Sequence, residues 1–185
     1  MAPWSSVRHC LEMFELRVLS EDDWRIWREL RLVALAEAPH AFGSTLSEWQ
    51  GVGDREERWR ARLAIPGSHN VIAMIDGRPV GMVSGVPTET ADEAMLISLW
   101  VSPSARGKGV ADRLITEVER WAMLDRAART LRLAVMPDNR QAIALYERHG
   151  FKDTGEPGDL PRDGVGREQA MAKALIGAGP FGDHR

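Results

Sequence analysis

The sequence has a single cysteine, Cys10, so it cannot form an internal disulfide, and nothing in it indicates an oxidising compartment. Basic residues are not in excess, and the net charge of −3 argues against nucleic-acid binding. No apolar run approaches the roughly 20 residues of a membrane helix. Glu12 and Glu15 interrupt the apolar residues where a signal peptide needs its core. We therefore expect a cytoplasmic protein with neither a nucleic-acid nor a membrane partner.

Residues that bind metal ions are also sparse. The five histidines show no ligand spacing, and one cysteine supplies no pair of sulfur ligands. The histidines are His9, His40, His69, His149 and His184. We expect no metal cofactor.

What is present is the composition of one globular domain. The 44% hydrophobic and 28% charged residues are ordinary for a soluble protein, and 185 residues can bury a core. Residues 1–13 show no clear period and are interpreted as an arm, and residues 177–185 as an unstructured tail. We expect the domain to span residues 14–176.

Hydrophobic periodicity predicts the elements of the first half. Alternation over residues 14–19 indicates a half-buried strand. Ser20 is a typical N-cap for a helix that Pro39 ends, and Asp54 is expected to start a second, more polar helix over residues 54–63.

A hairpin and then alternating helices and strands are predicted for the rest. Asp76-Gly77 suits a type I′ turn between strands at 71–75 and 80–86. The later elements are a strand over 94–101, a helix from Val110, a strand over 131–135, a helix over 140–149 with Gly150 as its C′ residue, and strands over 151–154 and 168–175 around a loop at 155–166.

The segment between residues 94 and 125 predicts an anion site. An apolar strand ends near Pro103, and a basic, glycine-bearing turn leads into a helix. The free N–H groups and the dipole of the first helical turn then converge on one point. Gly107 and Gly109 allow a phosphate close to the backbone, and Arg106 and Lys108 add two positive charges. We interpret the turn as a pyrophosphate site.

Two common phosphate motifs do not fit this turn. The Walker spacing GxxxxGK[ST] is absent, and the dinucleotide pattern GxGxxG lacks its third small residue. The run Arg106-Gly107-Lys108-Gly109-Val110-Ala111 instead resembles the acetyl-CoA signature R/Q-x-x-G-x-G/A of the GCN5-related N-acetyltransferases. Its place directly after a strand strengthens the resemblance.

A second motif supports the same family. The residues from Asn139 to Phe151, NRQAIALYERHGF, are similar to the family's N-x-x-A-x-x-L-Y-x-x-x-G-F segment. The resemblance covers residues 14–175 and implies an α+β fold. In that fold a mixed, mostly antiparallel sheet and about four helices form an α/β/α sandwich.

The resemblance implies acetyl-CoA as co-substrate. Main-chain groups of Leu99 and Val101 would bind the pantetheine arm, and the Val101 N–H would polarise the acetyl carbonyl; alternatively these are simply buried strand residues. For Asn139, a helix N-cap and a hydrogen bond to the pantetheine or acceptor side both stay open. The expected cofactor-binding residues are Leu99, Trp100, Val101, Arg106, Gly107, Lys108, Gly109, Val110, Ala111, Asn139 and Tyr146.

Tyr146, the only tyrosine, is the expected catalytic residue. A phenol with a pKa of about 10 keeps its proton at neutral pH and can give it to a departing thiolate. The family resemblance assigns it this role; the alternative is a ring buried against the sheet.

No general base is assigned. Some members of the family carry a glutamate early in the strand before the cofactor turn, but the register here puts Met95 there. The other residues considered are Asp92, Glu93, Glu48 and His40.

Several residues before the hairpin lie where the family binds its acceptor. Trp49 and Trp59 resemble part of an acceptor wall, whereas Trp24 and Trp27 are interpreted as core. The nearby acids could attract a cationic amine, but a solvated helix face is favoured. These acids are Glu48, Asp54, Glu56 and Glu57.

These features predict an N-acetyltransferase that passes acetyl directly from acetyl-CoA to a primary amine of a small molecule, peptide or protein. No covalent intermediate is expected, because Cys10 lies outside every motif. The alternative is a non-catalytic acyl-CoA-binding regulatory module of the same fold. A homodimer is left open.

Overall fold

The computed structural model describes residues 13–157 and 167–175. Its core is a seven-stranded sheet in the order β1-β2-β3-β4-β5-β7-β6. Only the β4–β5 pair is parallel. The strands are β1 (Phe14–Leu19), β2 (His69–Ile75), β3 (Arg78–Pro87), β4 (Glu93–Val101), β5 (Thr130–Val135), β6 (Lys152–Pro157) and β7 (Gln169–Ala174). The expected tail, and most of the expected arm and of the loop at 155–166, lie outside the described residues.

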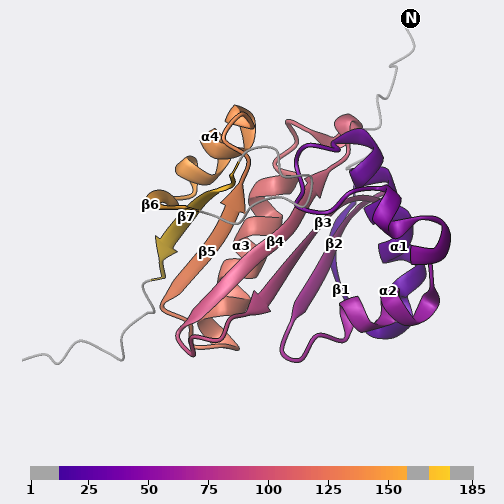
Figure 1. Ribbon diagram of the computed structural model, residues 1–185, viewed down its shortest axis with the longest axis horizontal. Coiled ribbons are helices and arrows are strands. Elements are labelled where there is room, and N and C mark those ends of the chain that lie inside the picture. Colours follow the sequence, from indigo (N-terminus) through magenta and orange to yellow (C-terminus); the bar gives the residue numbers. More distant parts are fainter. Residues whose placement is uncertain (1–12, 158–166, 176–185) are drawn as a thin grey trace, which may run out of the picture.

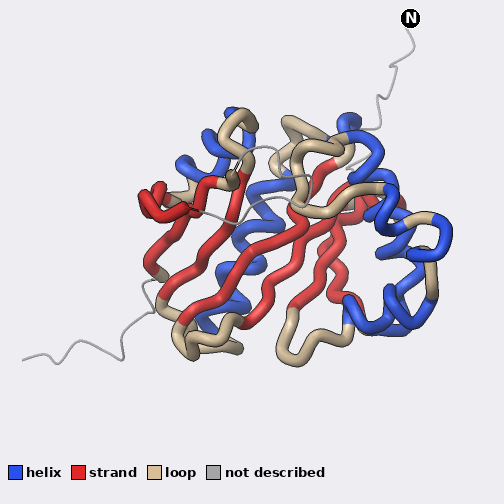
Figure 2. The backbone as a smooth tube through the Cα atoms, in the orientation of Figure 1, coloured by secondary structure: helices blue, strands red, loops and turns tan. Residues whose placement is uncertain are grey.

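Four α-helices flank this sheet, as Figures 1 and 2 show. They are α1 (Trp24–Glu37), α2 (Glu56–Leu63), α3 (Val110–Leu124) and α4 (Arg140–Arg148). Alternation along β2 separates the two faces: Val71 packs with the α3 side, and Ile72 packs with the α1–α2 side. The expected α/β/α sandwich is confirmed.

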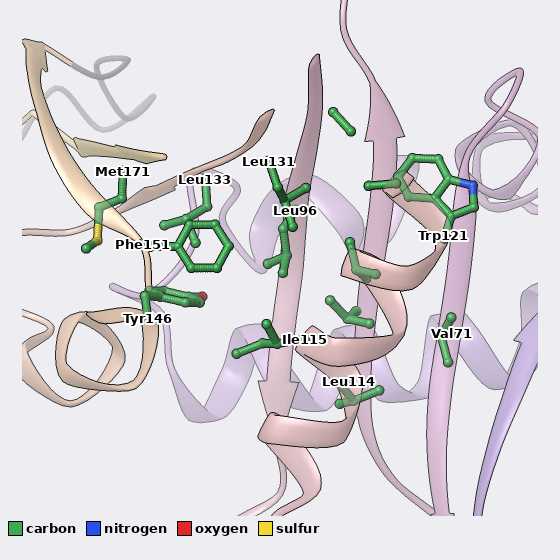
Figure 3. Packing of buried hydrophobic residues seen from close by; sticks show 14 of the residues in the cluster. Val71, Leu96, Leu114, Ile115, Trp121, Leu131, Leu133, Tyr146, Phe151 and Met171 are labelled. Atoms are coloured by element: carbon green, nitrogen blue, oxygen red, sulfur yellow. The ribbon is translucent and has the colours of Figure 1, made fainter. Parts of the chain in front are cut away.

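Two hydrophobic clusters hold the layers together. The larger joins α3 and α4 to the sheet, and Figure 3 shows Leu114, Ile115 and Trp121 of α3 facing its strands. The smaller contains Trp27 of α1 and Trp59 of α2, both essentially inaccessible to solvent. Burying one large apolar side chain contributes about 1.5–3 kcal/mol, so packing rather than helix propensity stabilises the short α2.

The hairpin forms as predicted. Asp76 and Gly77 have φ of 49° and 74°, the left-handed values that a type I′ turn requires at both central positions. Their turn pairs Ile75 with Arg78. The local dipeptide therefore determines the register of β2 and β3.

The start of α2 differs from the prediction. The helix begins at Glu56, with Arg55 as its N-cap, and Asp54 makes no cap. The Asp54 carboxylate instead forms an ion pair with Arg28 and accepts a hydrogen bond of 2.9 Å from Trp59 Nε1. These bonds tie α2 to α1 and lower the pKa of Asp54 to about 2. The Asp54 carboxylate therefore binds the side chains of Trp59 and Arg28 and does not accept from the free backbone N–H groups at the start of α2.

Candidate active site

The sheet opens where β4 leaves β5. The two strands pair only over Glu93–Met95 and Thr130–Arg132, so the later half of β4 faces no described strand on that side. A bulge shifts the β3–β4 register between Met82 and Ser84, and Ser98 opposite it has a φ of 59°. The strands therefore diverge, as the resemblance implies, and β4 presents backbone groups along the opening.

Three neighbouring cavities follow this opening. The first, of about 370 Å³, lies over the turn at 105–109 and the start of α3, and the second, of about 330 Å³, lies beside Leu99, Trp100, Val101 and α4. The third, of about 300 Å³, lies between β4 and the α1–α2 side. Val101 lines both the first and the second, and Tyr146 both the second and the third. Each cavity is therefore adjacent to the next along the opening.

The glycine turn has the geometry of an anion site. Gly107 and Gly109 have φ of 77° and 74°, and Gly109 is the N-cap of the 15-residue α3. A Cβ at either position would meet no protein atom within 4 Å, so the space above the turn is open. The free N–H groups and the positive end of the helix dipole are available to an anion in this space.

Arg106 has a partner that the sequence did not reveal. Its Nη2 donates to Glu37 at 2.8 Å, and its Nε donates to the Val101 carbonyl at 3.1 Å. Glu37 also accepts a 3.0 Å hydrogen bond from Trp100 Nε1, and both bonds lower its pKa. The end of α1 is thereby clamped to β4 and to the glycine turn. No local pattern indicates this pair, because 69 residues separate its members.

Asn139 begins α4 as an N-cap. Its Oδ1 accepts a hydrogen bond of 3.2 Å from the Ala142 N–H. The residue also lines the second cavity, together with Gln141 and Ala142. The capping interpretation is confirmed, and a contact with a ligand in that cavity is sterically open to the same side chain.

Tyr146 belongs both to the hydrophobic core and to the walls of the second and third cavities. It is 7% exposed, its ring packs edge-on against Phe151 with centroids 5.9 Å apart, and burial raises the pKa of its phenol. Figure 3 shows the hydroxyl at the end of the ring that points away from α4. The hydroxyl makes no hydrogen bond with any described residue. A neutral phenol at the junction of two cavities can therefore donate its proton to a ligand there.

None of the four residues considered as a general base lines the third cavity. Glu93 pairs with Arg132 at 3.4 Å where β4 and β5 are still joined, and Glu48 accepts from the Thr45 N–H at 2.8 Å. His40 is exposed, whereas Met95 lines the cavity as its register predicted. Within the described ranges, Glu168 supplies the only carboxylate in the wall, and sequence reasoning saw it only as the start of a strand.

The third cavity has aromatic walls. Trp49 and Trp59 lie 4.5 Å apart between ring centroids and line it, as expected of an acceptor wall. Trp27 is core, being 1% exposed, but it also borders the cavity. The acids Asp54 and Glu56 do not line it, because they pair with Arg28 and Arg60.

Two arginines that sequence reasoning missed, Arg31 and Arg62, also line this cavity. Their spacing gives a signal in retrospect. Arg31 lies four residues after Trp27 and four before Leu35, on the buried stripe of α1. Arg62 follows the buried Trp59 by three residues on α2.

The fold and the site together define a class of protein. A profile of the Acetyltransferase (GNAT) family matches residues 22–151, and the chain belongs to this family.

Curated relatives match part of their own length. The chain is 35% identical to the L-2,4-diaminobutyric acid acetyltransferase of Nocardia farcinica over 50% of this chain and 49% of that protein. It is 30% identical to the L-amino acid N-acetyltransferase AaaT of Escherichia coli over 54% of this chain and 64% of that protein. The chain thus spans about half to two thirds of the length of these relatives.

Solved structures share the fold over nearly the whole chain. An acetyltransferase of the GNAT family from Streptococcus pneumoniae superposes with a TM-score of 0.71 at 18% identity, over 89% of this chain and 100% of that one. The PaiA N-acetyltransferase of Thermoplasma acidophilum, solved with coenzyme A, gives 0.69 at 20% identity, over 88% and 99%.

The described residues lack two kinds of feature. No described helix has the length and apolarity needed to cross a membrane. The same part of the chain contains no group of three or more side chains suited to holding a metal ion.

Proposed function

We propose that this protein transfers an acetyl group from acetyl-CoA directly to the primary amine of a small molecule. The observation that carries the proposal is the row of three adjacent cavities from the glycine turn, along the open edge of β4, to Tyr146 and the aromatic walls of the third cavity. The curated relatives described above are named for amine-bearing small molecules, which supports an acceptor of that size.

Three parts of coenzyme A would each contact a different part of these adjacent cavities. The N–H groups at Gly107 to Ala111 would bind its pyrophosphate, and Lys108 would add positive charge. The pantetheine arm would pair with the main chain of Leu99 and Val101 and pass Asn139, and Trp100 would contribute through its backbone. The Val101 N–H would then lie at the thioester and stabilise the charge that develops on its carbonyl oxygen.

The chemistry needs one bond formed and one broken. The amine nitrogen attacks the thioester carbon, the C–S bond breaks, and the nitrogen gives its proton to solvent water, because no general base is assigned. Tyr146 would supply a proton to the departing thiolate. Burial raises the pKa of this phenol, so it is protonated at neutral pH and holds the proton that the thiolate needs.

Calorimetry with acetyl-CoA and release of free thiol against a panel of primary amines test this proposal. We expect binding, and thiol release that depends on both enzyme and amine. Absence of acetyl-CoA binding would overturn the proposal. Binding without acetyl transfer to any amine would instead favour the non-catalytic acyl-CoA-binding module.

A further inference from the structure

One buried and one half-buried cation lie in the wall of the aromatic cavity, which is the third cavity. Arg31 of α1 is 8% exposed, and Arg62 of α2 borders the same space. The pKa of each guanidinium is lowered to about 10, for Arg62 by burial and for Arg31 by burial together with the positive charge of Arg62. The two charges therefore lie close enough to repel each other, in a place that water reaches poorly.

Arg31 lacks a partner among the described residues. Its Nη1 is inaccessible to solvent and makes no hydrogen bond, and the guanidinium forms no ion pair there. Its guanidinium lies over the ring of Phe42, 4.4 Å from the ring centroid. Many arginines elsewhere in the described residues have carboxylate partners, among them Arg17, Arg28, Arg60, Arg106, Arg120, Arg132 and Arg148. Burying a cation without an anion costs free energy, so the Arg31 guanidinium would gain from a bound anion.

Arg62 is held in place by neutral groups. Its guanidinium donates to Asn70 Oδ1 at 3.2 Å, Ser84 Oγ at 3.1 Å and Ser98 Oγ at 3.5 Å, and it lies over the ring of Trp27. Ser98 is the residue whose left-handed backbone accompanies the bulge of β4. These contacts fix the guanidinium and leave its charge unneutralised.

The rest of the wall adds another unmatched donor. Trp49 Nε1 is buried without a hydrogen-bond partner in the described residues. Glu168 is the only carboxylate in the described wall, so two positive charges face one negative charge. The cavity therefore favours a ligand that brings a further negative charge and acceptor oxygens.

We infer that the acceptor is a free amino acid, whose carboxylate binds Arg31 and Arg62 while its reactive amine lies toward Leu99 and Tyr146. The inference rests on the proposed acetyl transfer. Guanidinium groups pair with planar carboxylates through two parallel N–H···O bonds, which neutral oxygens and ammonium groups cannot replace. The aromatic walls supply apolar surface for the side chain, and about 300 Å³ suits a small molecule.

Acceptors that differ only in the carboxylate test the inference. L-lysine is compared with 1,5-diaminopentane, and L-phenylalanine with both 2-phenylethylamine and L-phenylalaninamide, by thiol release from acetyl-CoA. We expect kcat/KM to be about 10- to 100-fold higher for the carboxylate-bearing member, as loss of a charge-assisted hydrogen bond predicts. Equal or better turnover of the carboxylate-free amines would overturn the inference while leaving the acetyltransferase proposal in place.

Two substitutions in α1 test whether Arg31 causes the preference for carboxylate-bearing acceptors. Arg31→Met keeps the length and apolar stem of the side chain and removes its charge. We expect it to lower kcat/KM for amino acids about 10- to 100-fold and to leave acetyl-CoA affinity and turnover of the decarboxylated amines within about 2-fold. Arg25→Met, at an exposed position of the same helix, is the matched control and should behave as wild type. An equal loss for both acceptor types would overturn a role of Arg31 in carboxylate recognition.

Two further experiments distinguish binding from transfer, and carboxylate recognition from phosphate recognition. Calorimetry of amino acids with the CoA-loaded protein measures binding without turnover. Amino-acid binding without transfer would show that the cavity binds amino acids but would overturn the acetyl transfer, and with it the acceptor role; absence of binding would overturn the inference alone. Preference for 2-aminoethyl phosphate over every amino acid would show that the anion recognised is a phosphate, and would overturn the carboxylate assignment.

Discussion

Replacement of Tyr146 by phenylalanine isolates one hydroxyl group at the junction of the second and third cavities. The ring is almost fully buried against Phe151, and its hydroxyl forms no hydrogen bond with the described residues. Tyr146→Phe therefore keeps the packing and leaves no buried partner unsatisfied. We expect the free energy of unfolding to change by less than about 1 kcal/mol, the cost of an ordinary hydrogen bond.

The expected effect on catalysis is much larger. If the phenol protonates the thiolate, its loss removes a general acid, which typically contributes about 10²–10⁴-fold in rate. We expect kcat to fall by at least about 100-fold, equivalent to about 2.7 kcal/mol, with acetyl-CoA affinity unchanged. Stopped-flow or steady-state detection of free CoA gives kcat, and calorimetry gives the dissociation constant.

A neighbouring substitution controls for disturbed packing. Phe151→Leu changes the ring that contacts Tyr146 and leaves the hydroxyl in place. We expect it to lower stability by about 1–2 kcal/mol, since it removes buried ring volume, and to retain most of the turnover. A kcat within 2-fold of wild type in Tyr146→Phe, or equal losses in the two variants, would remove the hydroxyl from the mechanism.

Three other predictions concern the turn, the sheet and an ion pair. Gly109→Ala forces a left-handed φ on an L residue at a cost of about 1–2 kcal/mol, and we expect weaker acetyl-CoA binding by calorimetry; unchanged affinity would contradict the anion site. In Gly85→Ala the new Cβ would lie 2.4 Å from Trp121 Cζ3, so thermal unfolding should show a loss of about 1–3 kcal/mol, and an unchanged melting temperature would refute this packing. The pKa of Asp54 is depressed to about 2 by Arg28, so the stability that this carboxylate contributes is complete above its unfolded value near pH 4 and is lost as the pH falls toward 2. The stability difference between wild type and Asp54→Asn should therefore be constant at neutral pH and shrink below pH 4 in denaturant titrations; a difference independent of pH would exclude the ion pair.

Features that depend on neighbouring residues were predictable from the sequence. The Asp76-Gly77 turn follows from the backbone conformations that these two residues favour, and the cap at Asn139 follows from its side chain, which reaches the next helical turn. The position of Tyr146 on the inner face of α4 follows from its motif. These local preferences, repeated in the order of strands and helices, also indicated the family, which the profile match confirmed.

Features that depend on residues far apart in the sequence could not be predicted from it. Asp54 looked like a helix cap because the sequence could not show that Arg28 and Trp59 lie within its reach. Glu37 gave no local sign that it would clamp Arg106, and Arg31 and Arg62 resembled ordinary charges on polar helices. The sequence by itself determined most of the elements, the glycine turn before α3 and the family, because these rest on contacts within a few residues. Only the tertiary structure decided where the buried charges lie, because the energy of a charge depends on everything packed around it.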